Sequence, residues 1–161
     1  MKVKEVMTPH ATAIWLTESL ADAAKLMWEN DCGVLPIIKD GQKVVGMITD
    51  RDICMATAMR DRNPSGISVE EVMTRRVYAV NPEDNIDQAL QQMQEHRIRR
   101  LPVLNPEGEL EGMLSMNDIV LNAQMSDGKA EDSIEYGDVV KTYQAICQHP
   151  VPAEIGSAVS A

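Results

Sequence analysis

Apolar residues in the first part of the chain follow the spacing of a helix and then the spacing of strands. Between Leu20 and Trp28 they recur three and four residues apart, which predicts an amphipathic helix whose stripe lies in the core. Residues 34–38 and 44–49 are short apolar runs around a turn, and they predict a strand hairpin. A short strand is expected before this succession, at Ala13-Ile14, and a second helix is expected to begin near Arg51.

The same succession returns 66 residues later without a gap. Residues 3–56 align with residues 69–122, so a strand is expected at Ala79-Val80 and a helix is expected after a cap at Asn81-Pro82. Internal repeats mark supersecondary units that bury their apolar faces against one another. Two copies therefore predict one α/β module with the order β-α-β-β-α in each repeat, pseudo-twofold symmetry and two equivalent clefts.

The repeats divide the chain into four parts. We expect repeat 1 over residues 1–57, a polar linker over 58–68, repeat 2 over 69–123 and a C-terminal extension over 124–161. The extension carries apolar residues at helical spacing, namely Ile134, Val139, Val140, Tyr143, Ile146 and Cys147. This spacing predicts a short amphipathic helix, and the small-residue tail after Pro150 is expected to be disordered.

Each repeat closes with a hydroxyl residue followed three positions later by an acid, at a predicted turn from strand to helix. The pairs are Thr49 with Asp52 and Ser115 with Asp118. One interpretation is a capping box, in which each side chain satisfies a backbone N–H at the start of the helix. The other is a ligand site, in which the helix amides and the hydroxyl bind phosphate while the carboxylate accepts ribose hydroxyls. Two coincident copies favour the ligand site, as do Gly46 and Gly112, which would let a ligand approach the backbone.

These marks resemble the CBS domain, and two of them in tandem resemble a Bateman module. The resemblance is carried by the octapeptides at 46–53 and 112–119, by the Val-Met-Thr segments that open each repeat, and by the hairpin prolines Pro36 and Pro102. It covers roughly three quarters of the chain. It implies that the acid of each closing pair binds ribose and that the hydroxyl lies near phosphates.

The resemblance also implies an apolar slot for adenine. Its members would be Ile14, Ala79 and Val80 from the first strands, with Val34, Pro36 and Pro102 as walls. An adenine needs such a slot because its faces are hydrophobic while its rim carries donors and acceptors. Ordinary core packing explains any single one of these residues equally well.

Charge distinguishes the two repeats. Repeat 2 carries Arg97, Arg99 and Arg100 where repeat 1 has none. Arginine suits bidentate contacts to phosphate, and the resemblance implies that Arg99 and Arg100 reach nucleotide phosphates. The alternative is that these arginines pair with surface acids, which is the interpretation that we favour for Arg97.

Composition narrows the possible functions. The formal net charge of −10 argues against binding nucleic acid through a broad basic face. No stretch approaches the ~18 apolar residues of a membrane span, and the N-terminus lacks an apolar signal core, so we expect a cytoplasmic protein without membrane contact. Cys32, Cys54 and Cys147 form no Cys-x-x-Cys pair, which favours neither a disulfide framework nor a metal site. No catalytic motif is apparent.

The sequence thus favours a non-catalytic sensor that needs no cofactor and takes AMP, ADP or ATP as a regulatory ligand. It would signal to an effector protein that the sequence does not identify. A homodimer is expected, because the helices of both repeats carry more apolar stripes than one module can cover. Two alternatives remain open, a ligand-free structural dimerisation module and a sensor of S-adenosylmethionine; an enzyme acting on nucleotides is the weakest competitor.

Overall fold

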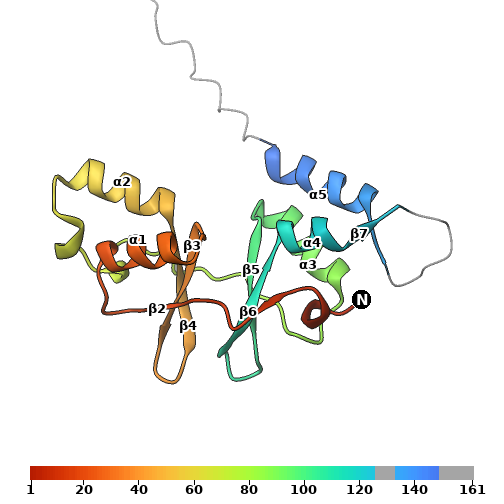
Figure 1. Ribbon diagram of the computed structural model, residues 1–161, viewed down its shortest axis with the longest axis horizontal. Helices are drawn as coiled ribbons and strands as arrows, with labels where there is room; N and C mark the ends of the chain where they lie inside the picture. Colours follow the sequence, from red (N-terminus) through yellow and green to blue (C-terminus); the bar gives the residue numbers. More distant parts are fainter. Residues whose placement is uncertain (126–132, 149–161) are drawn as a thin grey trace, which may run out of the picture.

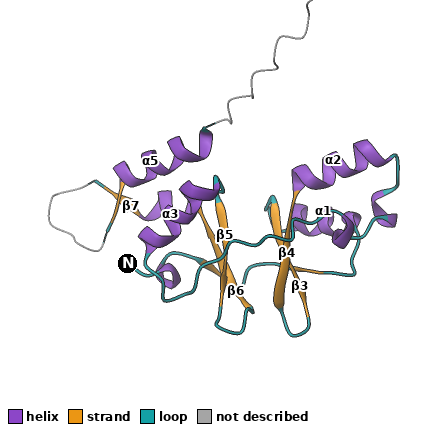
Figure 2. Cartoon of the chain, turned by 180° about the vertical axis from the view of Figure 1, so that it is seen from behind, coloured by secondary structure: helices purple, strands orange, loops and turns teal. Residues whose placement is uncertain are grey.

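Each half of the molecule contains a three-stranded sheet with two helices packed against it, and the two halves stand side by side (Figure 1). The computed structural model describes residues 1–125 and 133–148. The sheets lie towards the middle of the molecule and most helices lie outside them (Figure 2). Surfaces of both repeats therefore meet at the centre. None of the helices in the described segments has both the length and the apolar content to cross a membrane.

Repeat 1 follows the predicted order. Its elements are β2 (Ile14–Trp15), α1 (Leu20–Glu29), β3 (Val34–Lys39), β4 (Lys43–Thr49) and α2 (Asp50–Arg60). Strand β2 runs parallel to β3, and β4 pairs with β3 in the predicted antiparallel hairpin. The buried residues of α1 are Leu20, Ala23 and Met27, so most of its predicted stripe lies in the core. Ala24 and Trp28 are exposed instead, Trp28 by 87%, and the prediction that they are buried is wrong for the isolated chain.

Repeat 2 has the same order with a weaker first strand. Its elements are α3 (Ile86–His96), β5 (Arg100–Leu104), β6 (Leu110–Ser115) and α4 (Met116–Asn122). The expected strand at Ala79-Val80 is reduced to one parallel bridge between Val80 and Val103. The predicted cap at Asn81-Pro82 is wrong, because α3 begins after Asn85, whose backbone N–H donates to the Gln88 side chain at 2.8 Å.

The segments that open the two repeats are exchanged. Strand β1 (Thr8–Pro9) pairs with β6 of repeat 2, and Val3 belongs to the core cluster of that repeat. Conversely, Val69 and Met73 belong to the core cluster of repeat 1, and Met47 of β4 bridges to Thr74. Short 3₁₀ turns at Val3–Glu5, Pro64–Gly66 and Val69–Glu71 shape these segments. Because each opening segment packs on the other half, the exchange holds the two halves together.

Gly46 and Gly112 make room for the exchanged segments. A methyl group at Gly112 would lie 2.5 Å from the carbonyl oxygen of Thr8, and one at Gly46 would lie 2.6 Å from the sulfur of Met73. Both distances are too short for carbon. The requirement for glycine at these two positions therefore comes from the crossing of the chain, rather than from the approach of a ligand as the sequence suggested.

The C-terminal extension forms the expected amphipathic helix. Strand β7 (Ala123–Gln124) runs parallel to β8 (Ile134–Glu135), and α5 (Tyr136–Cys147) follows. Helix α5 packs against α3 and α4 and lies over them in Figure 1. Thr142 of α5 is completely buried, and its hydroxyl accepts a hydrogen bond from the Gln94 amide at 2.8 Å. The tail after Pro150 lies outside the described residues.

Candidate functional site

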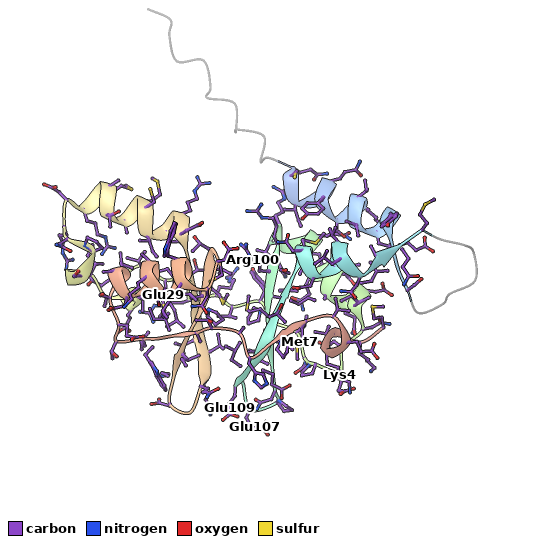
Figure 3. The ribbon with its side chains drawn as sticks, in the orientation of Figure 1. Lys4, Met7, Glu29, Arg100, Glu107 and Glu109 are labelled. Atoms are coloured by element: carbon purple, nitrogen blue, oxygen red, sulfur yellow. The ribbon has the colours of Figure 1, made fainter. Side chains whose placement is uncertain are left out.

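Two cavities lie where the halves meet, and their linings are related by the repeat. The Thr49 cleft has a volume of about 340 Å³ and the Ser115 cleft a volume of about 420 Å³. Equivalent positions line them, such as Met47 and Thr74 in the first cleft against Met113 and Thr8 in the second. Val34 and Arg100, which are themselves equivalent, line both. The two clefts therefore form a pseudo-symmetric pair with a common wall, and Arg100 lies between the halves (Figure 3).

The Thr49 cleft gathers basic side chains. Its arginines are Arg76, Arg97, Arg99 and Arg100. Within residues 1–125 and 133–148, none of the four forms a salt bridge, whereas Arg60, Arg62 and Arg75 pair with Glu71 or Glu70. The expectation that Arg97 pairs with a surface acid is therefore not met there. In a chain with ten more acids than bases, four arginines that form no salt bridge with the described residues create a local site for an anion at this cavity.

The Thr49 cleft also has apolar and aromatic lining residues. They are Val34, Met47, Pro102 and Tyr78. The Tyr78 ring stacks on His96 with centroids 3.6 Å apart and planes 17° apart, which restricts its orientation. The sequence did not suggest Tyr78 or Arg76. The available signal was the repeat alignment, which sets Tyr78 against Thr12 and Arg76 against His10.

The Ser115 cleft is polar and contains acids. Asp118 Oδ2 accepts hydrogen bonds from the Ser115 backbone at 2.8 Å and from its hydroxyl at 2.6 Å, while Oδ1 accepts from the Thr8 hydroxyl at 3.2 Å. Asp31 lines the same cleft, and Arg100 is the only arginine among its described lining residues. Arg97 and Arg99 line the other cleft, so the structure separates Asp118 from two of the three arginines of its own repeat.

Asp52 is oriented differently from Asp118. It caps α2 in the same way, with Oδ2 accepting from the Thr49 backbone at 2.9 Å and from its hydroxyl at 2.7 Å. Both capping boxes are thus present. Asp52 lines a hollow between α2 and Val72 rather than the Thr49 cleft. Ser115 and Asp118 line one cavity, whereas the hydrogen-bonded pair Thr49 and Asp52 lines two different cavities.

The predicted adenine slot divides between clefts and core. Val34 lines both clefts and Pro102 lines the Thr49 cleft. Ile14 and Val80 are 0% and 3% exposed and belong to the two core clusters. Pro36 is also buried, Ala79 is half-buried, and neither lines either cleft. Residues slightly earlier in the opening segments, Ala11-Thr12 and Tyr78, face the cavities instead.

Comparison with known proteins agrees with this duplicated architecture. Residues 3–58 and 69–123 each match the CBS domain. The chain belongs to the CBS domain family. It contains a CBS pair, with one repeat in each half of the α/β structure described above.

Its relatives include small CBS proteins from bacteria. The CBS domain-containing protein YhcV of Bacillus subtilis is 33% identical over 132 residues, which cover 82% of this chain and 91% of YhcV. Hypoxic response protein 1 of Mycobacterium tuberculosis is 34% identical over 116 residues, which cover 72% of this chain and 80% of that protein. A crystal structure of Hypoxic Response Protein I with two coordinated zinc ions has a TM-score of 0.69, 32% identity and coverage of 75% and 98%.

Other solved CBS pairs hold ligands that contain adenosine. CBSX2 of Arabidopsis thaliana in complex with AMP has a TM-score of 0.65 at 28% identity, covering 74% of this chain and 93% of that one. The CBS pair of MJ0100 in complex with 5′-methylthioadenosine and S-adenosyl-L-methionine has a TM-score of 0.65 at 27% identity, covering 75% and 94%. In the described part of this chain, no cluster of three or more ligating side chains could hold a metal ion.

Proposed function

We propose that this CBS pair is a non-catalytic regulatory sensor that binds AMP, ADP or ATP between its repeats. The observation that carries the proposal is the set of four arginines that line the Thr49 cleft together with apolar residues. Guanidinium groups bind phosphate oxygens bidentately. Their local charge offsets the repulsion that a protein of net charge −10 exerts on an anion.

The apolar and the basic lining residues of the Thr49 cleft suit the two ends of a nucleotide. Val34, Met47 and Pro102 offer apolar contacts to the faces of adenine, with Tyr78 beside them. The arginines offer donors to the phosphates, and the Thr49 hydroxyl is a further polar group in the same cavity. AMP bound to the related CBSX2 pair supports this class of ligand. The preference of the cleft for AMP, ADP or ATP depends on how many of its arginines can bind phosphate oxygens at the same time.

A sensor must convert occupancy into a change that a partner detects. A ligand shifts an equilibrium only by its difference in affinity for two arrangements. The Thr49 cleft is lined by residues of both repeats, including Thr49 and Arg99, so a bound nucleotide contacts both halves. We propose that binding changes the packing of one repeat against the other.

Thermal shift with a nucleotide series tests the proposal. A ligand specific to the folded state stabilises it by RT ln(1 + [L]/Kd), which is ~2.7 kcal/mol at a hundredfold excess over Kd. ATP, ADP and AMP should raise the melting temperature more than adenosine or inorganic phosphate. ATP should be recovered intact after incubation with the protein. No shift with any member of the series would favour a ligand-free structural module, and ATP turnover would favour an enzyme.

A second candidate ligand, S-adenosylmethionine, is favoured by the Ser115 cleft. Its Asp31 and Asp118 face the cavity with only Arg100 among the described arginines, which suits a ligand with a positive sulfonium better than one with phosphates. The complex of the related MJ0100 pair supports this chemistry. Under this proposal, Asp118→Ala weakens S-adenosylmethionine in calorimetry and leaves ATP nearly unchanged.

We also propose that the chain forms a homodimer, as its apolar helix stripes predict. Helices α4 and α5 contact each other and leave Leu121 83% and Val140 56% exposed, and Met125, which follows β7, is 76% exposed. Burying apolar surface contributes ~25 cal/mol per Å². Sedimentation should show a dimer that Leu121→Glu dissociates. A wild-type monomer at micromolar concentration would contradict the proposal.

A further inference from the structure

Arg100 is the one charged side chain that lines both clefts among the residues that the structure describes. Its guanidinium has no hydrogen bond or salt bridge to any of those residues. Arg100 is half-buried, whereas Arg76, Arg97 and Arg99 are exposed. A charged group that is partly removed from water and left without a partner is costly, which indicates that a ligand supplies its contacts.

The fold places Arg100 at the boundary between the halves. It opens β5 and lies directly opposite Ser115 of β6, so the two side chains are on the same face of the sheet. Its equivalent in repeat 1 is Val34, which lies opposite Thr49 in the same way. The pseudo-twofold relation brings positions 34 and 100 together in the common wall, and only one of them is charged. One guanidinium therefore serves two clefts.

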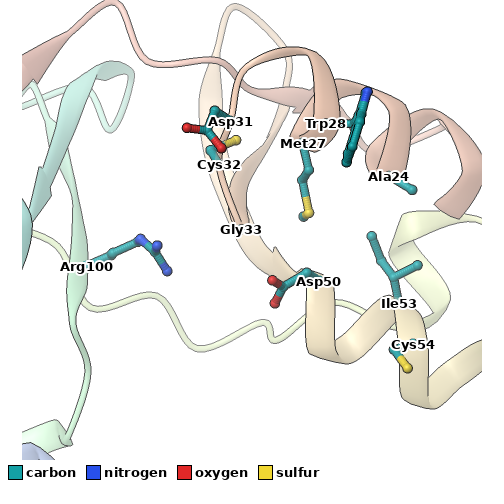
Figure 4. A pocket seen from close by; sticks show the side chains of 10 residues that line it. All are labelled: Ala24, Met27, Trp28, Asp31, Cys32, Gly33, Asp50, Ile53, Cys54 and Arg100. Atoms are coloured by element: carbon teal, nitrogen blue, oxygen red, sulfur yellow. The ribbon is translucent and has the colours of Figure 1, made fainter.

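The two clefts differ in the charges that surround this guanidinium. In the Thr49 cleft, Arg100 adds to three other arginines. In the Ser115 cleft it lies with Asp31 and Asp118, and His10 lines the same cleft. Figure 4 shows the Arg100 side chain extending from repeat 2 towards the carboxylates of Asp31 and Asp50 in repeat 1. An arginine side chain has several rotatable bonds, so its charge can lie nearer to one cleft or to the other.

We propose that Arg100 couples the two clefts, so that an anionic ligand in the Thr49 cleft and a cationic ligand in the Ser115 cleft strengthen each other's binding. This inference rests on the proposed nucleotide site. A phosphate in the Thr49 cleft attracts the guanidinium, which leaves Asp31 and Asp118 to a cation. A cation in the Ser115 cleft repels the guanidinium towards the phosphates. Both ligands favour the same position of Arg100, and each shifts the equilibrium by its difference in affinity for the two positions.

The charges of the two ligands set the sign of the coupling. Each ligand changes the affinity for the other by the same factor, because binding free energies are reciprocal. Two anions, one in each cleft, would compete for one guanidinium and oppose each other. The sensor therefore responds most strongly when a nucleotide and a cationic ligand are present together.

Calorimetry with paired ligands tests this coupling on the full chain. ATP is the anionic probe and S-adenosylmethionine is the cationic probe. S-adenosylhomocysteine, which lacks the sulfonium charge, is the matched control ligand. Saturating S-adenosylmethionine should tighten ATP by roughly fivefold or more, the lower range of allosteric coupling, and saturating ATP should tighten S-adenosylmethionine by the same factor. S-adenosylhomocysteine should tighten ATP much less, and high salt should weaken the coupling by screening the charges.

Two arginine variants separate the coupling from binding itself. Arg100→Met keeps a long side chain without its charge. It should weaken ATP by roughly tenfold, the effect of one charged hydrogen bond, while it tightens S-adenosylmethionine and abolishes the coupling. Arg99→Met is the matched control, because Arg99 lines the Thr49 cleft alone. It should weaken ATP and leave both the affinity for S-adenosylmethionine and the coupling factor unchanged. Circular dichroism reports whether both variants have folded.

The outcomes distinguish this coupling from the proposed function. If ATP does not bind at all, the nucleotide function fails and the coupling fails with it. If ATP binds while S-adenosylmethionine does not bind, or weakens ATP, the nucleotide function stands and the coupling is overturned. Coupling that survives Arg100→Met, or that is equally strong with S-adenosylhomocysteine, overturns the role assigned to the Arg100 charge.

Discussion

The Thr49 cleft and the Ser115 cleft are built from equivalent positions, yet they offer different chemistry. Arg76 and Arg97 line the first where His10 and Asp31 line the second. The backbones that carry them follow the same order of elements, and Arg100 belongs to both. Duplication has therefore preserved the fold while the charge of the two cavities has diverged. The difference implies that the two clefts prefer ligands of different charge.

The largest effect should come from removing two arginines of the Thr49 cleft together. Each charged hydrogen bond lost costs ~1.5–3 kcal/mol. Arg99→Ala with Arg100→Ala should therefore weaken ATP, ADP and AMP by roughly a hundredfold or more in calorimetry, while adenosine is nearly unaffected. The salt dependence of nucleotide binding should also flatten, because exposed charge interactions are screened by salt.

Arg75→Ala is the matched control for this pair. Arg75 pairs with Glu70 at 3.3 Å and lines neither cleft, so its loss should leave nucleotide affinity unchanged. If AMP and adenosine lose affinity equally in the double variant, the arginines are structural. The charge contrast between the clefts would then have no role in ligand choice.

The secondary structure followed from local pattern, whereas the exchange of the opening segments did not. The helical and strand periodicities depend only on residues within each element, and they predicted α1, α3 and both hairpins. The opening segments Val6-Met7-Thr8 and Val72-Met73-Thr74 have the same residues. Their local sequence therefore gives no signal for which half receives which segment. Only tertiary packing decides it.

The same exchange explains what was missed at the site. Arg99 and Arg100 were recognised because the second copy is basic where the first is not. Arg76 and Tyr78 lie in an opening segment that the repeat pattern assigns to its own half, far from Thr49 in the sequence. Ile14 and Val80 were placed near a ligand on resemblance, but strand geometry turns both into the core.

The next largest effect on ligand affinity should come from removing an acid of a capping box, and it should differ between Asp118 and Asp52. Asp118 lines the Ser115 cleft and also accepts from Thr8, whereas Asp52 lies outside the Thr49 cleft. Asp118→Ala should weaken ligands of the Ser115 cleft by roughly tenfold to a hundredfold, and Asp52→Ala should change the affinity for ATP much less. Calorimetry with S-adenosylmethionine and ATP measures both.

Both substitutions should lower the melting temperature similarly. Each removes a capping interaction, which typically stabilises a protein by ~1 kcal/mol and corresponds to about 2–4 °C for a chain of this size. If both lower the melting temperature and neither changes the affinity for any ligand, the hydroxyl-acid pairs act as caps alone.

A smaller effect, on stability alone, is expected from alanine substitutions at Gly112 and Gly46, which should differ in their cost to the free energy of unfolding. A methyl group at Gly112 meets a backbone oxygen, which cannot move without the strand, whereas one at Gly46 first meets the flexible end of Met73. Gly112→Ala should cost ~1–3 kcal/mol of the free energy of unfolding, as overpacking does, and Gly46→Ala should cost less. Urea denaturation measures both. Gly66→Ala, where nothing lies within 4 Å, is the control. Equal costs at Gly46 and Gly112 would contradict the difference between the two crossings.

The smallest effect should come from the ion pairs that hold the exchanged segments. Glu71 lies 3.1 Å from Arg60 and 3.0 Å from Arg62, which fastens the second opening segment to repeat 1. The Ser68 backbone N–H and then Arg62 lower the pKa of Glu71, and a hydrogen bond from Lys4 lowers the pKa of Glu83. A carboxyl whose pKa is lower in the folded state stabilises the fold above its ordinary pKa.

That contribution is lost as the pH falls through the lowered pKa of the folded state. Glu71→Gln should therefore lower the melting temperature slightly at about pH 7, and the difference should shrink as the pH falls through the lowered pKa of the Glu71 carboxyl, because the wild-type side chain is then protonated in both the folded and the unfolded state. The effect is small because the side chains are exposed and salt screens them. Glu107→Gln, at the exposed tip of the β5–β6 hairpin (Figure 3), is the matched control. A Glu71→Gln difference that persists unchanged at the acid end would show that the carboxylate charge does not hold the exchanged segment.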